Sequence, residues 1–464
     1  MLENTLKERL DAIFAAQKRF FHSEATLDPA FRRQQLKALL RAIETHEQDL
    51  ADALWQDLHK SFEEAYLTEI SLVKAEIRSA MRHVVRWARR ERKPTPVTIF
   101  GSRSFIVKEP LGTALIVSPW NYPLQLLLNP LVGAIAAGCT AVLKPSPYVP
   151  NVSLAIERLI RSAFREEYIA VVQGNREVNG QLFAMKFDLI FFTGSPALAR
   201  TVAAAAAPNL TPLVLELGGK SPCIIGKDAD VRLAAKRIAW GKSLNAGQTC
   251  IAPDYLLMHP AVKEAFIAAF AAAMKELHGE DILSQKHYVR MVNDKAFERV
   301  TGYLKEGTVR YGGRTDAAER FIEPTLLDGV APGADVLTTE IFGPVFPVVT
   351  LDDPSRSFED QVVDYVTSRE KPLALYYFGK EKEGWSIVRR TSSGGSCIND
   401  TIMHIVNPNV PFGGVGNSGM GHYHGLESFE AFTHRRAVIS TPTAFDLPFR
   451  YMPYRLFKWV KRLV

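Results

Sequence analysis

The sequence predicts an α/β protein built on two parallel sheets, and three observations support this fold class. Strand-like apolar runs alternate with helical patterns from about residue 112 to 215, and a second alternation runs from about 222 to 400. Such alternation is typical of βαβ units, whose helices cover both faces of a parallel sheet. The third observation is the length of 464 residues, which exceeds what one hydrophobic core accommodates and predicts two or three domains.

The chain begins with a region of helical pattern that extends to about residue 92. Apolar residues recur there at intervals of three and four, as in DPAFRRQQLKALLRAIETHEQDLADALWQDL and EEAYLTEISLVKAEIRSAMRHVVRWA. Glu3, Glu8 and Asp11 stand among the first apolar positions, which indicates an amphipathic helix rather than a signal peptide. Pro94 and Pro96 then interrupt the pattern, and the bases before them fit a solvated helix end.

Strands and helices then alternate in two series. The first series has expected strands in GTALIVS, TAVLKP, YIAVVQG, FDLIFFTG and PLVLELGG, with helices such as LQLLLNPLVGAIAAG and PALARTVAAAAAP between them. The second has expected strands in SPCIIG, YLLMH, FGPVFPVVTL and PLALYYFG, with helices from Asp230 to Asn245 and in AVKEAFIAAFAAAMKEL. Ligands of open parallel sheets bind beyond the carboxyl ends of the strands. The segments SPWN, KPS, TGS and ELGG are therefore expected to form a site.

The composition argues against several classes of function. A net charge of +6 is small for this length and does not indicate a nucleic-acid-binding protein. The four cysteines are far apart and include no CxxC pair, which argues against a zinc site or a disulfide framework and fits a reducing compartment. No run approaches the roughly 18 apolar residues of a membrane-spanning helix. We expect a cytoplasmic protein without a bound metal.

Five polar residues stand at predicted strand ends or sharp turns: Asn121 in SPWNYP, Lys144 in LKPS, Glu216 in LELGGKSP, Cys250 in GQTC and Glu340 in EIFGPV. Together they suit thiol attack on a carbonyl, with Asn as a donor to the oxyanion and Glu as a base. Each also has a structural interpretation. The cysteine can be a buried hydrophobe, the asparagine a helix cap, and the lysine and Glu340 solvated charges. Glu216 is harder to explain in this way, because a carboxylate that ends an apolar run is costly unless paired or functional.

The sequence contains one literal GxGxxG motif, GVGNSG from Gly414 to Gly419. It follows PNVPF, a poor strand with two prolines, and no acidic residue stands about 20 positions further on to hold a ribose. We expect a tight loop at the surface or at an active-site wall rather than a dinucleotide fingerprint.

Taken together, the motifs resemble those of the NAD(P)-dependent aldehyde dehydrogenases, and most of all the class 3 branch. The family's order and spacing are present in SPWNYP, VLKPS, FFTGS, LELGGKSP, NAGQTCIAPD, EIFGPV and PFGGVGNSGMG. Class 3-like segments are AWGKSLNAGQTCIAPDYLL, REKPLALYYF, TSSGG and SGMGHYHGLESFEAFTHRR. The resemblance covers roughly residues 5 to 440. It implies an aldehyde dehydrogenase-like α/β fold with a Rossmann-type cofactor domain, an α/β catalytic domain and a small β bridging element.

The resemblance implies oxidation of an aldehyde to the acid with NAD or NADP as cofactor. Cys250 would form a thiohemiacetal and then a thioester, and water activated by Glu216 would release the acid. Asn121 and the backbone N–H of Cys250 would stabilise the oxyanion. Whether Glu216 or Glu340 is the principal base stays open. Cys139, Cys223 and Cys397 are expected to be structural.

The implied cofactor contacts are Lys144 at the adenine ribose, Gly194 and Ser195 at the pyrophosphate, Glu340 at the nicotinamide ribose with Phe342 beside it, and also Trp120 and Gly218. The substrate is expected to be an apolar aldehyde, medium- or long-chain aliphatic or aromatic. The residues expected around it are Tyr122, Leu124, Thr249, Ile251 and Met403.

Two positions depart from the family's pattern. Pro147 stands where the family commonly has the Glu of KPSE. The loss of that carboxylate removes a repulsion against a 2′-phosphate, so NADP should be used at least as readily as with Glu present. Ala199 replaces the last glycine of FTGSxxxG, and we expect this mild change to leave binding intact.

The resemblance also implies a division into domains and a dimer. Residues 1–92 and 110–215 would form the helical N-terminus and cofactor domain, 216–395 the catalytic domain, and 93–109 with 396–442 the bridging and oligomerisation element. A homodimer is expected because class 3 members are typically dimers built through such an arm. The basic amphipathic tail, 443–464, could place residues 449–464 on the inner face of an anionic membrane, dock on protein or stay disordered.

Two other classes of function remain open on the sequence. A cysteine hydrolase without a cofactor would use Cys250 and Asn121 but make no use of Lys144, Gly194 or Glu340. A catalytically silent structural protein would need none of them.

Overall fold

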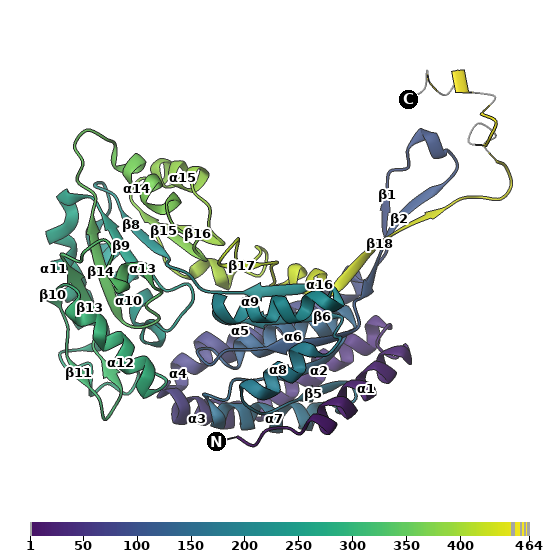
Figure 1. Ribbon diagram of the computed structural model, residues 1–464, viewed down its shortest axis with the longest axis horizontal. Coiled ribbons are helices and arrows are strands. Elements are labelled where there is room, and N and C mark those ends of the chain that lie inside the picture. The colour runs from purple at the N-terminus through teal and green to yellow at the C-terminus, as the bar shows by residue number, and fades with distance from the viewer. Residues whose placement is uncertain (1, 447–450, 455–456, 459–460, 462–464) are drawn as a thin grey trace.

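The computed structural model describes residues 2–446, 451–454, 457–458 and 461 (Figure 1). It contains two parallel-sheet lobes, with a three-stranded arm that projects beyond the first of them. The predicted fold class is confirmed. In Figure 1 the first lobe runs from purple to teal, the second is mostly green, and the arm lies at the upper right.

The N-terminal helices pack beneath the first sheet, as the helical pattern predicts. Helix α2 starts with an Asp28 side chain that accepts the backbone N–H of Ala30 and has a proline in its first turn, which is a typical helix start. A π-helical turn, η1, interrupts the helical region just before α5. The bounds are α1 (Lys7–His22), α2 (Pro29–Thr45), α3 (Glu47–Leu58), α4 (Phe62–Ala65), η1 (Tyr66–Ile70) and α5 (Ser71–Trp87).

The first lobe is a six-stranded sheet in the order β17-β7-β6-β3-β4-β5. Strands β3 to β7 are parallel, and β3, β4 and β6 are buried along their whole length because helices cover both faces. Its elements are β3 (Thr113–Val117), α6 (Gln125–Ala137), β4 (Thr140–Lys144), α7 (Pro150–Ala163), β5 (Ile169–Val171), α8 (Arg176–Ala184), β6 (Leu189–Thr193), α9 (Pro196–Ala206), β7 (Leu213–Glu216) and the antiparallel β17 (Gly419–Met420).

The second lobe is a seven-stranded sheet in the order β10-β13-β14-β9-β8-β15-β16. All its strands are parallel except β10, which pairs with β13 in the opposite direction. Its elements are β8 (Pro222–Ile225), α10 (Val231–Ser243), β9 (Tyr255–Met258), α11 (Lys263–His278), α12 (Asp294–Gly302), β10 (Thr308–Tyr311), β13 (Thr325–Asp328), α13 (Asp335–Thr338), β14 (Val345–Thr350), α14 (Phe358–Thr367), β15 (Ala374–Phe378), α15 (Glu381–Arg390) and β16 (Gly395–Ile398), with the small hairpin β11 (Thr315–Asp316) and β12 (Phe321–Ile322).

The arm is an antiparallel sheet of β1 (Glu91–Lys93), β2 (Arg103–Pro110) and β18 (Thr433–Ser440). Residues 396–442 are divided among three sheets, because β16 extends the second lobe, β17 extends the first, and β18 alone joins the arm. Helix α16 (Leu426–Ala431) packs on α6 in the first lobe. The segment 396–442 is therefore not one bridging element.

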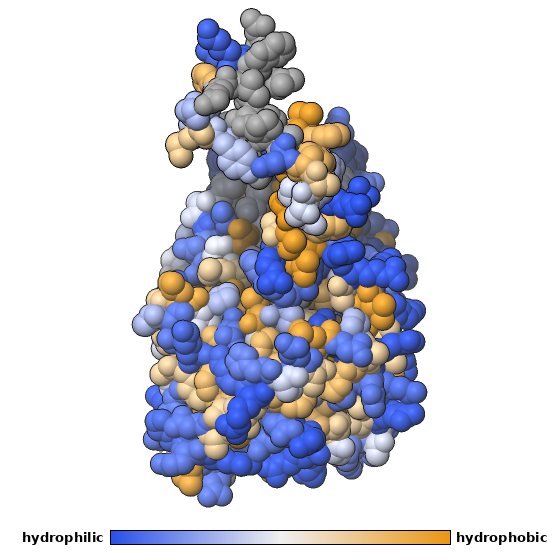
Figure 2. Space-filling view, turned by 90° about the vertical axis from the view of Figure 1, so that its right-hand side faces the viewer, coloured by the Kyte–Doolittle hydropathy of each residue, from blue (hydrophilic) through white to orange (hydrophobic). Residues whose placement is uncertain are grey.

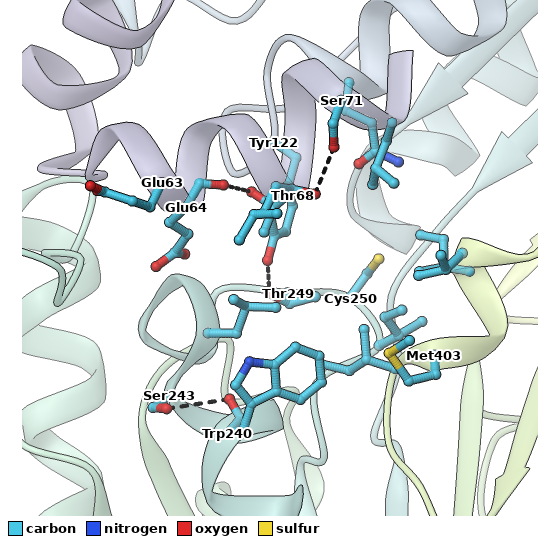
Figure 3. A pocket seen from close by; sticks show the side chains of 18 of the residues that line it. Glu63, Glu64, Thr68, Ser71, Tyr122, Trp240, Ser243, Thr249, Cys250 and Met403 are labelled. Atoms are coloured by element: carbon cyan, nitrogen blue, oxygen red, sulfur yellow. Dashed lines mark hydrogen bonds between the residues drawn. The ribbon is translucent and has the colours of Figure 1, made fainter. Parts of the chain in front are cut away.

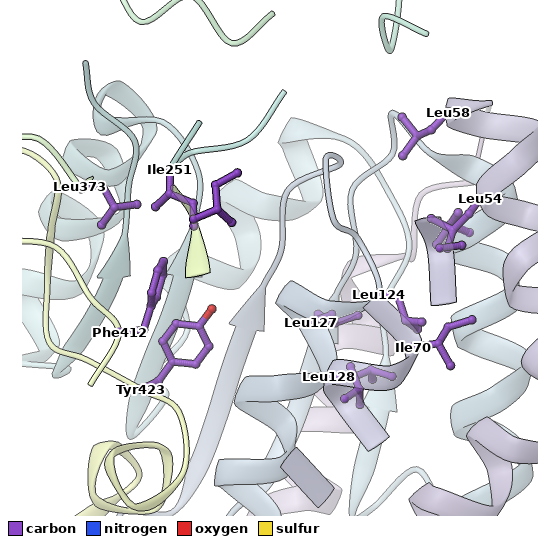
Figure 4. Close-up of a cluster of buried hydrophobic side chains, with 14 of the residues drawn as sticks. Leu54, Leu58, Ile70, Leu124, Leu127, Leu128, Ile251, Leu373, Phe412 and Tyr423 are labelled. Carbon is purple, nitrogen blue, oxygen red and sulfur yellow. The ribbon is translucent and has the colours of Figure 1, made fainter. Parts of the chain in front are cut away.

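One buried apolar cluster extends through both lobes and joins them (Figure 4). It includes Leu54 and Leu128 from the first lobe, Leu373 from the second, and Tyr423 from the segment between β17 and α16. Burial of this apolar surface favours a fixed placement of the two lobes.

The prediction for residues 449–464 falls largely outside the described residues, so the arrangement of that tail is not part of the structure. Within the described part of the chain, no helix combines the length and apolarity that crossing a bilayer requires.

Candidate active site

The turn that precedes Cys250 has an unusual backbone. After α10, the short helix η4 (Leu244–Gly247) contains Asn245 with φ 52° and Ala246 with φ 51°, both in the left-handed region. Gly247 follows with φ 70°, and a Cβ there would collide with the carbonyl of Gly343. Alanine rarely adopts this conformation without support from surrounding contacts. The turn is therefore held by its environment rather than by local preference.

Cys250 opens into a cavity of about 620 Å³ between the lobes (Figure 3). Tyr122, Thr249, Ile251 and Met403 line the same cavity, so four of the expected substrate contacts lie together around the thiol. The Tyr122 hydroxyl and the Thr249 hydroxyl are 2.7 Å apart and share a hydrogen bond.

The expectation for Leu124 is wrong. Its side chain is fully buried in the apolar core (Figure 4), and it does not line the cavity. The chain turns into α6 at this point, so residues two positions apart no longer point to the same side.

The remaining wall of the cavity is mostly apolar, with a few polar side chains at its rim. Met403 lies on the short helix η7 (Met403–Val406) and is 43% exposed. The apolar lining residues are Leu67, Leu72, Leu126, Trp240, Leu244, Leu277, Ile402, Ile405, Val406 and Phe412.

Asn121 is buried next to the turn that precedes Cys250. Its Nδ2 donates a hydrogen bond to the backbone carbonyl of Gln248 at 3.0 Å, and its own backbone carbonyl accepts the side-chain N–H of Asn245 at 3.0 Å. The alternative role as a helix cap is wrong, because α6 begins without a side-chain cap. An amide nitrogen carries two protons, so one Nδ2–H remains for a ligand.

Two carboxylates, Glu340 and Glu216, influence the pKa of the Cys250 thiol. Burial, first of all, and the charges of Glu340 and Glu216 together raise the pKa of Cys250 to about 12. Burial also holds the pKa of Glu216 well above its usual range. Both oxygens of Glu216 are buried and have no hydrogen-bond partner among the described residues. A base of raised pKa that faces a protonated thiol is suited to proton transfer near neutral pH.

The glycine-rich loop lies directly beside Glu216. Gly419 in β17 pairs with Glu216 in β7, and the backbone N–H of Leu217 donates to the Ser418 carbonyl at 3.1 Å. The segment from Gly414 to Gly419 thus forms a tight loop against the site, as expected, rather than opening a helix.

Lys144, Gly194 and Ser195 stand at the same edge of the first sheet, at the ends of β4 and β6, which are separated by β3. Lys144 ends β4 and is buried, and its Nζ donates to the carbonyl of Pro145 at 2.8 Å. Burial lowers its pKa to about 8. Ser195 caps α9, where its hydroxyl accepts the backbone N–H of Leu198. A buried lysine and a helix start at the same edge of a parallel sheet are suited to ribose hydroxyls and phosphate oxygens.

Glu340 is held over Gly218 at the start of the second lobe. The backbone N–H of Gly219 donates to Glu340 Oε1 at 3.1 Å, and the space next to the Gly218 Cα is filled by the Glu340 carboxylate. Burial raises the pKa of Glu340 to about 8, and the charge of Asp254 adds to the rise. The interpretation of Glu340 as a solvated surface charge is therefore wrong. Phe342 lies beside this carboxylate in sequence and contacts Trp120 edge to face, with ring centroids 5.4 Å apart.

The two departures from the family's pattern have simple structural settings. Pro147 is half-buried just after β4, so no carboxylate stands at that point of the first sheet. Ala199 is buried in α9 and packs in the apolar core of the first lobe.

Sequence reasoning missed several buried polar groups at the site. Lys60 and Glu69 form an ion pair at 2.6 Å with fully buried side chains, and Lys60 also donates to the carbonyl of Asn121 at 3.3 Å. Glu64 accepts the backbone N–H of Asn245 at 2.8 Å. The Tyr423 hydroxyl lies close enough for Glu216 and Cys250 to raise its pKa. The helical pattern alone treats such charges as a solvated face.

The site thus combines a cavity-facing thiol, two carboxylates of raised pKa and a buried lysine at the strand ends of a parallel sheet, which defines a cysteine-dependent oxidoreductase of the nucleotide-binding α/β class. Residues 2–438 match the model of the aldehyde dehydrogenase family. The chain belongs to this family.

Similar proteins support the assignment over the full chain. The 4,4′-diaponeurosporen-aldehyde dehydrogenase of Staphylococcus aureus is 43% identical, with 97% of both chains covered. The dimeric NADP-preferring aldehyde dehydrogenase of the dog is 43% identical over 93% of this chain and 95% of that protein, and human aldehyde dehydrogenase family 3 member B1 is 42% identical over 90% and 89%. The solved substrate-bound state of Staphylococcus aureus AldH has a TM-score of 0.95 at 42% identity, and covers 98% of this chain and 99% of that one.

The protein is accordingly an NAD(P)-dependent enzyme that oxidises aldehydes to carboxylic acids. The resemblance to the class 3 branch is confirmed by the family 3 relatives. A cofactor-independent hydrolase and a silent structural protein are not what these comparisons support.

Proposed function

We propose that Cys250 is the nucleophile, Glu216 the base and Asn121 the oxyanion donor of the aldehyde oxidation. The observation that carries this proposal is the position of the Cys250 thiol in the cavity under the electrostatic influence of Glu216 and Glu340. A thiol of raised pKa is protonated at neutral pH and needs a base before it attacks a carbonyl.

Glu216 is the better candidate for that base. Its two oxygens have no protein donor among the described residues, whereas Glu340 is tied to the N–H of Gly219. Glu216 takes the thiol proton as the sulfur attacks, which forms a thiohemiacetal on Cys250. Glu216 then gives this proton up to solvent. After oxidation to the thioester, the regenerated carboxylate takes a proton from the water that releases the acid.

Asn121 stabilises the negative oxygen that develops in both stages. The Nδ2–H that is not given to Gln248 donates to this oxygen, together with the backbone N–H of Cys250. Because Lys60 and Asn245 fix the Asn121 carbonyl, the amide is oriented before the substrate binds.

The residues at the strand ends fit a nicotinamide dinucleotide. Lys144 is a buried cation that forms no ion pair with a carboxylate of the described residues. It would bind the adenine ribose, with Gly194 and Ser195 at the pyrophosphate. Glu340 would accept hydroxyls of the second ribose, beside Phe342, Trp120 and Gly218. When bound, the cofactor accepts the hydride of the thiohemiacetal. Pro147 leaves room and no negative charge for a 2′-phosphate, which supports NADP as well as NAD.

The substrate class follows from the cavity. Its volume of about 620 Å³ and its mostly apolar wall support a medium- or long-chain aliphatic or aromatic aldehyde. The similarity to a carotenoid-aldehyde dehydrogenase supports the longer end of this range.

A homodimer built through the arm and a cytoplasmic location complete the proposal. Seen from the arm side, apolar atoms are gathered over the arm (Figure 2), and exposed apolar side chains there include Val97, Phe100 and Ile439. A relative is named as dimeric.

Four free cysteines are compatible with a reducing compartment. Contact of residues 449–464 with an anionic membrane remains a separate proposal that rests on their sequence.

The test follows the formation of reduced nicotinamide from a panel of aldehydes with NAD or NADP. We expect the wild type and the control Cys397→Ala to be active, since Cys397 does not line the cavity, and Cys250→Ala to lose at least about 10⁴-fold in kcat. An active Cys250→Ala enzyme would refute the proposed nucleophile. Ester cleavage that depends on Cys250 without any aldehyde oxidation would favour the hydrolase instead.

A further inference from the structure

The turn that carries the nucleophile is held from outside by several segments. Asn121 bonds to the side chain of Asn245 and to one of the turn's carbonyls, residues 290 and 292 bond to the side chain of Gln248, and one short segment of the first lobe accepts the first backbone N–H of the turn. Residues 245–250, here called the nucleophile loop, include Asn245 and Ala246 in the left-handed region. A non-glycine pair in this region persists only where surrounding contacts over-determine it. The contact that reaches the first strained residue through its backbone is the hydrogen bond from the Asn245 N–H to Glu64 Oε1 at 2.8 Å.

Glu64 is itself fixed on both sides. Its backbone N–H donates to the Ser61 hydroxyl at 3.2 Å, and its carbonyl accepts the Thr68 hydroxyl at 2.6 Å. It lies in α4, directly before the π-helical turn η1. Such turns are frequent at functional sites, and here the turn carries Glu69, whose carboxylate accepts the backbone N–H of Leu124 at 2.9 Å. One segment thus braces both the nucleophile loop and the turn that contains Asn121.

Figure 3 shows Glu64 and Glu63 as neighbours on the same helix, with the Glu64 carboxylate directed to the side of the cavity where Thr249 and Cys250 lie. Both residues line the cavity. Glu63 is exposed, whereas Glu64 is half-buried and bonded to the loop. The chain therefore offers a matched control one residue away.

We propose that Glu64 is a positioning residue for the nucleophile loop: its carboxylate accepts the Asn245 N–H and so keeps the left-handed turn that presents Cys250 to the cavity. Glu64 does not act on the aldehyde. The proposal rests on the proposed function in one respect, namely that Cys250 is the nucleophile.

The electrostatic surroundings give the proposal a pH signature. Burial raises the pKa of Glu64 to about 7; Lys60 and the Asn245 N–H lower it, and Glu69 raises it. Tyr122 and Tyr288 also face this carboxylate and have raised pKa values. Above about pH 7 the ionised carboxylate makes a charge-assisted hydrogen bond to the loop, and below it the neutral acid makes a weaker one. Loop order therefore falls as the pH falls through this value.

The test compares Glu64→Ala, Glu64→Asp and Glu64→Gln with the control Glu63→Ala. Two quantities are measured: kcat and KM for octanal oxidation, and the alkylation rate of Cys250 by iodoacetamide without cofactor, followed by peptide mass spectrometry. We expect Glu64→Ala and the shortened Glu64→Asp to lower kcat and the alkylation rate at least about tenfold, with KM changed less than about threefold. Glu64→Gln keeps an acceptor oxygen and should retain both rates within about threefold. Glu63→Ala should keep the wild-type alkylation rate, because no hydrogen bond joins Glu63 to the nucleophile loop, all of which the structure describes; it is a control for the loop and not for KM, since Glu63 lines the cavity.

The pH profile separates a positioning role from a general structural one. From pH 6 to 8 the wild-type alkylation rate should show a step near 7 in addition to thiol ionisation, and Glu64→Gln should lack this step. Unchanged alkylation in Glu64→Ala, or an equal loss in Glu63→Ala, would overturn the proposal. If Cys250→Ala stays active, the proposed nucleophile fails, while the alkylation series still decides the role of Glu64 on the loop.

Discussion

Alanine at position 218 tests how Glu340 is held. A Cβ on Gly218 would lie well under 3.0 Å from both carboxylate oxygens of Glu340, a distance that real Cβ atoms essentially never show. The φ of Gly218 is outside the left-handed region, so alanine adds no backbone strain. The substitution therefore acts by displacing the Glu340 carboxylate, and with it the 3.1 Å hydrogen bond from the N–H of Gly219.

The size of the effect follows from the hydrogen bonds that Glu340, in the proposed function, accepts from the ribose hydroxyls. A hydrogen bond to a charged group contributes about 1.5–3 kcal/mol, which corresponds to about a 10- to 150-fold change in a binding constant. We expect the Kd of the dinucleotide to rise by this factor in Gly218→Ala, because Glu340 can no longer reach the ribose hydroxyls.

Isothermal titration of NAD and NADP into the purified enzyme measures this Kd directly. Gly180→Ala is the matched control, since a Cβ at Gly180 meets nothing within 4 Å. Glu340→Gln should raise the Kd as well, and the double variant should be no weaker than the weaker single one, because both changes act on one group. Additive losses, or a Kd in Gly218→Ala within about threefold of the wild type, would refute the reasoning.

Three further substitutions or conditions have defined outcomes. Pro147→Glu should lower the ratio of NADP to NAD efficiency at least about tenfold in steady-state kinetics, since the new carboxylate repels a 2′-phosphate; an unchanged ratio would refute this role. Lys60→Met leaves Glu69 buried and unpaired, so it should lower the free energy of unfolding by about 3–5 kcal/mol. Thermal unfolding should show a clear fall in Tm, and the double variant Lys60→Met/Glu69→Gln should recover part of it. A double variant with no recovery of Tm would contradict the ion-pair argument. Because the pKa of Glu340 is about 8, its ionised fraction rises with pH, and calorimetry should find tighter dinucleotide binding at pH 9 than at pH 6.5 in the wild type but not in Glu340→Gln.

The regular elements could be predicted because their signals are local. Alternating apolar runs and turn residues located β3, β4, β6 and β7, and the strand-end rule selected Lys144 and Glu216 without knowledge of the fold. A residue at the carboxyl end of a parallel strand has a nearly fixed place in such a sheet.

The supports of the nucleophile loop could not be predicted in the same way. Glu64 and Asn245 are 181 positions apart, and Lys60 reaches Asn121 across 61. The two acidic residues of this segment, Glu64 and Glu69, fit the polar side of an amphipathic helix, and the π-helical turn that contains Glu69 leaves no clear pattern in the sequence. The prediction that Leu124 contacts the substrate was wrong for a related reason, since the direction of its side chain depends on where the chain turns into α6.

Several buried polar groups around Cys250 have no hydrogen-bond partner in the part of the chain that the structure describes, which ordinary packing of a protein core does not explain. Asn121 Oδ1, both oxygens of Glu216 and the Tyr423 hydroxyl are buried without a hydrogen-bond partner among the described residues. Each such group costs free energy in the folded state. Their position around one thiol is therefore unfavourable for stability alone, and the proposed reaction would supply the missing partners, because the thiol proton and a water molecule can donate to these oxygens. The charged contacts that hold the surroundings of the thiol, Glu64 at the N–H of Asn245 and Lys60 at the carbonyl of Asn121, offset part of this cost.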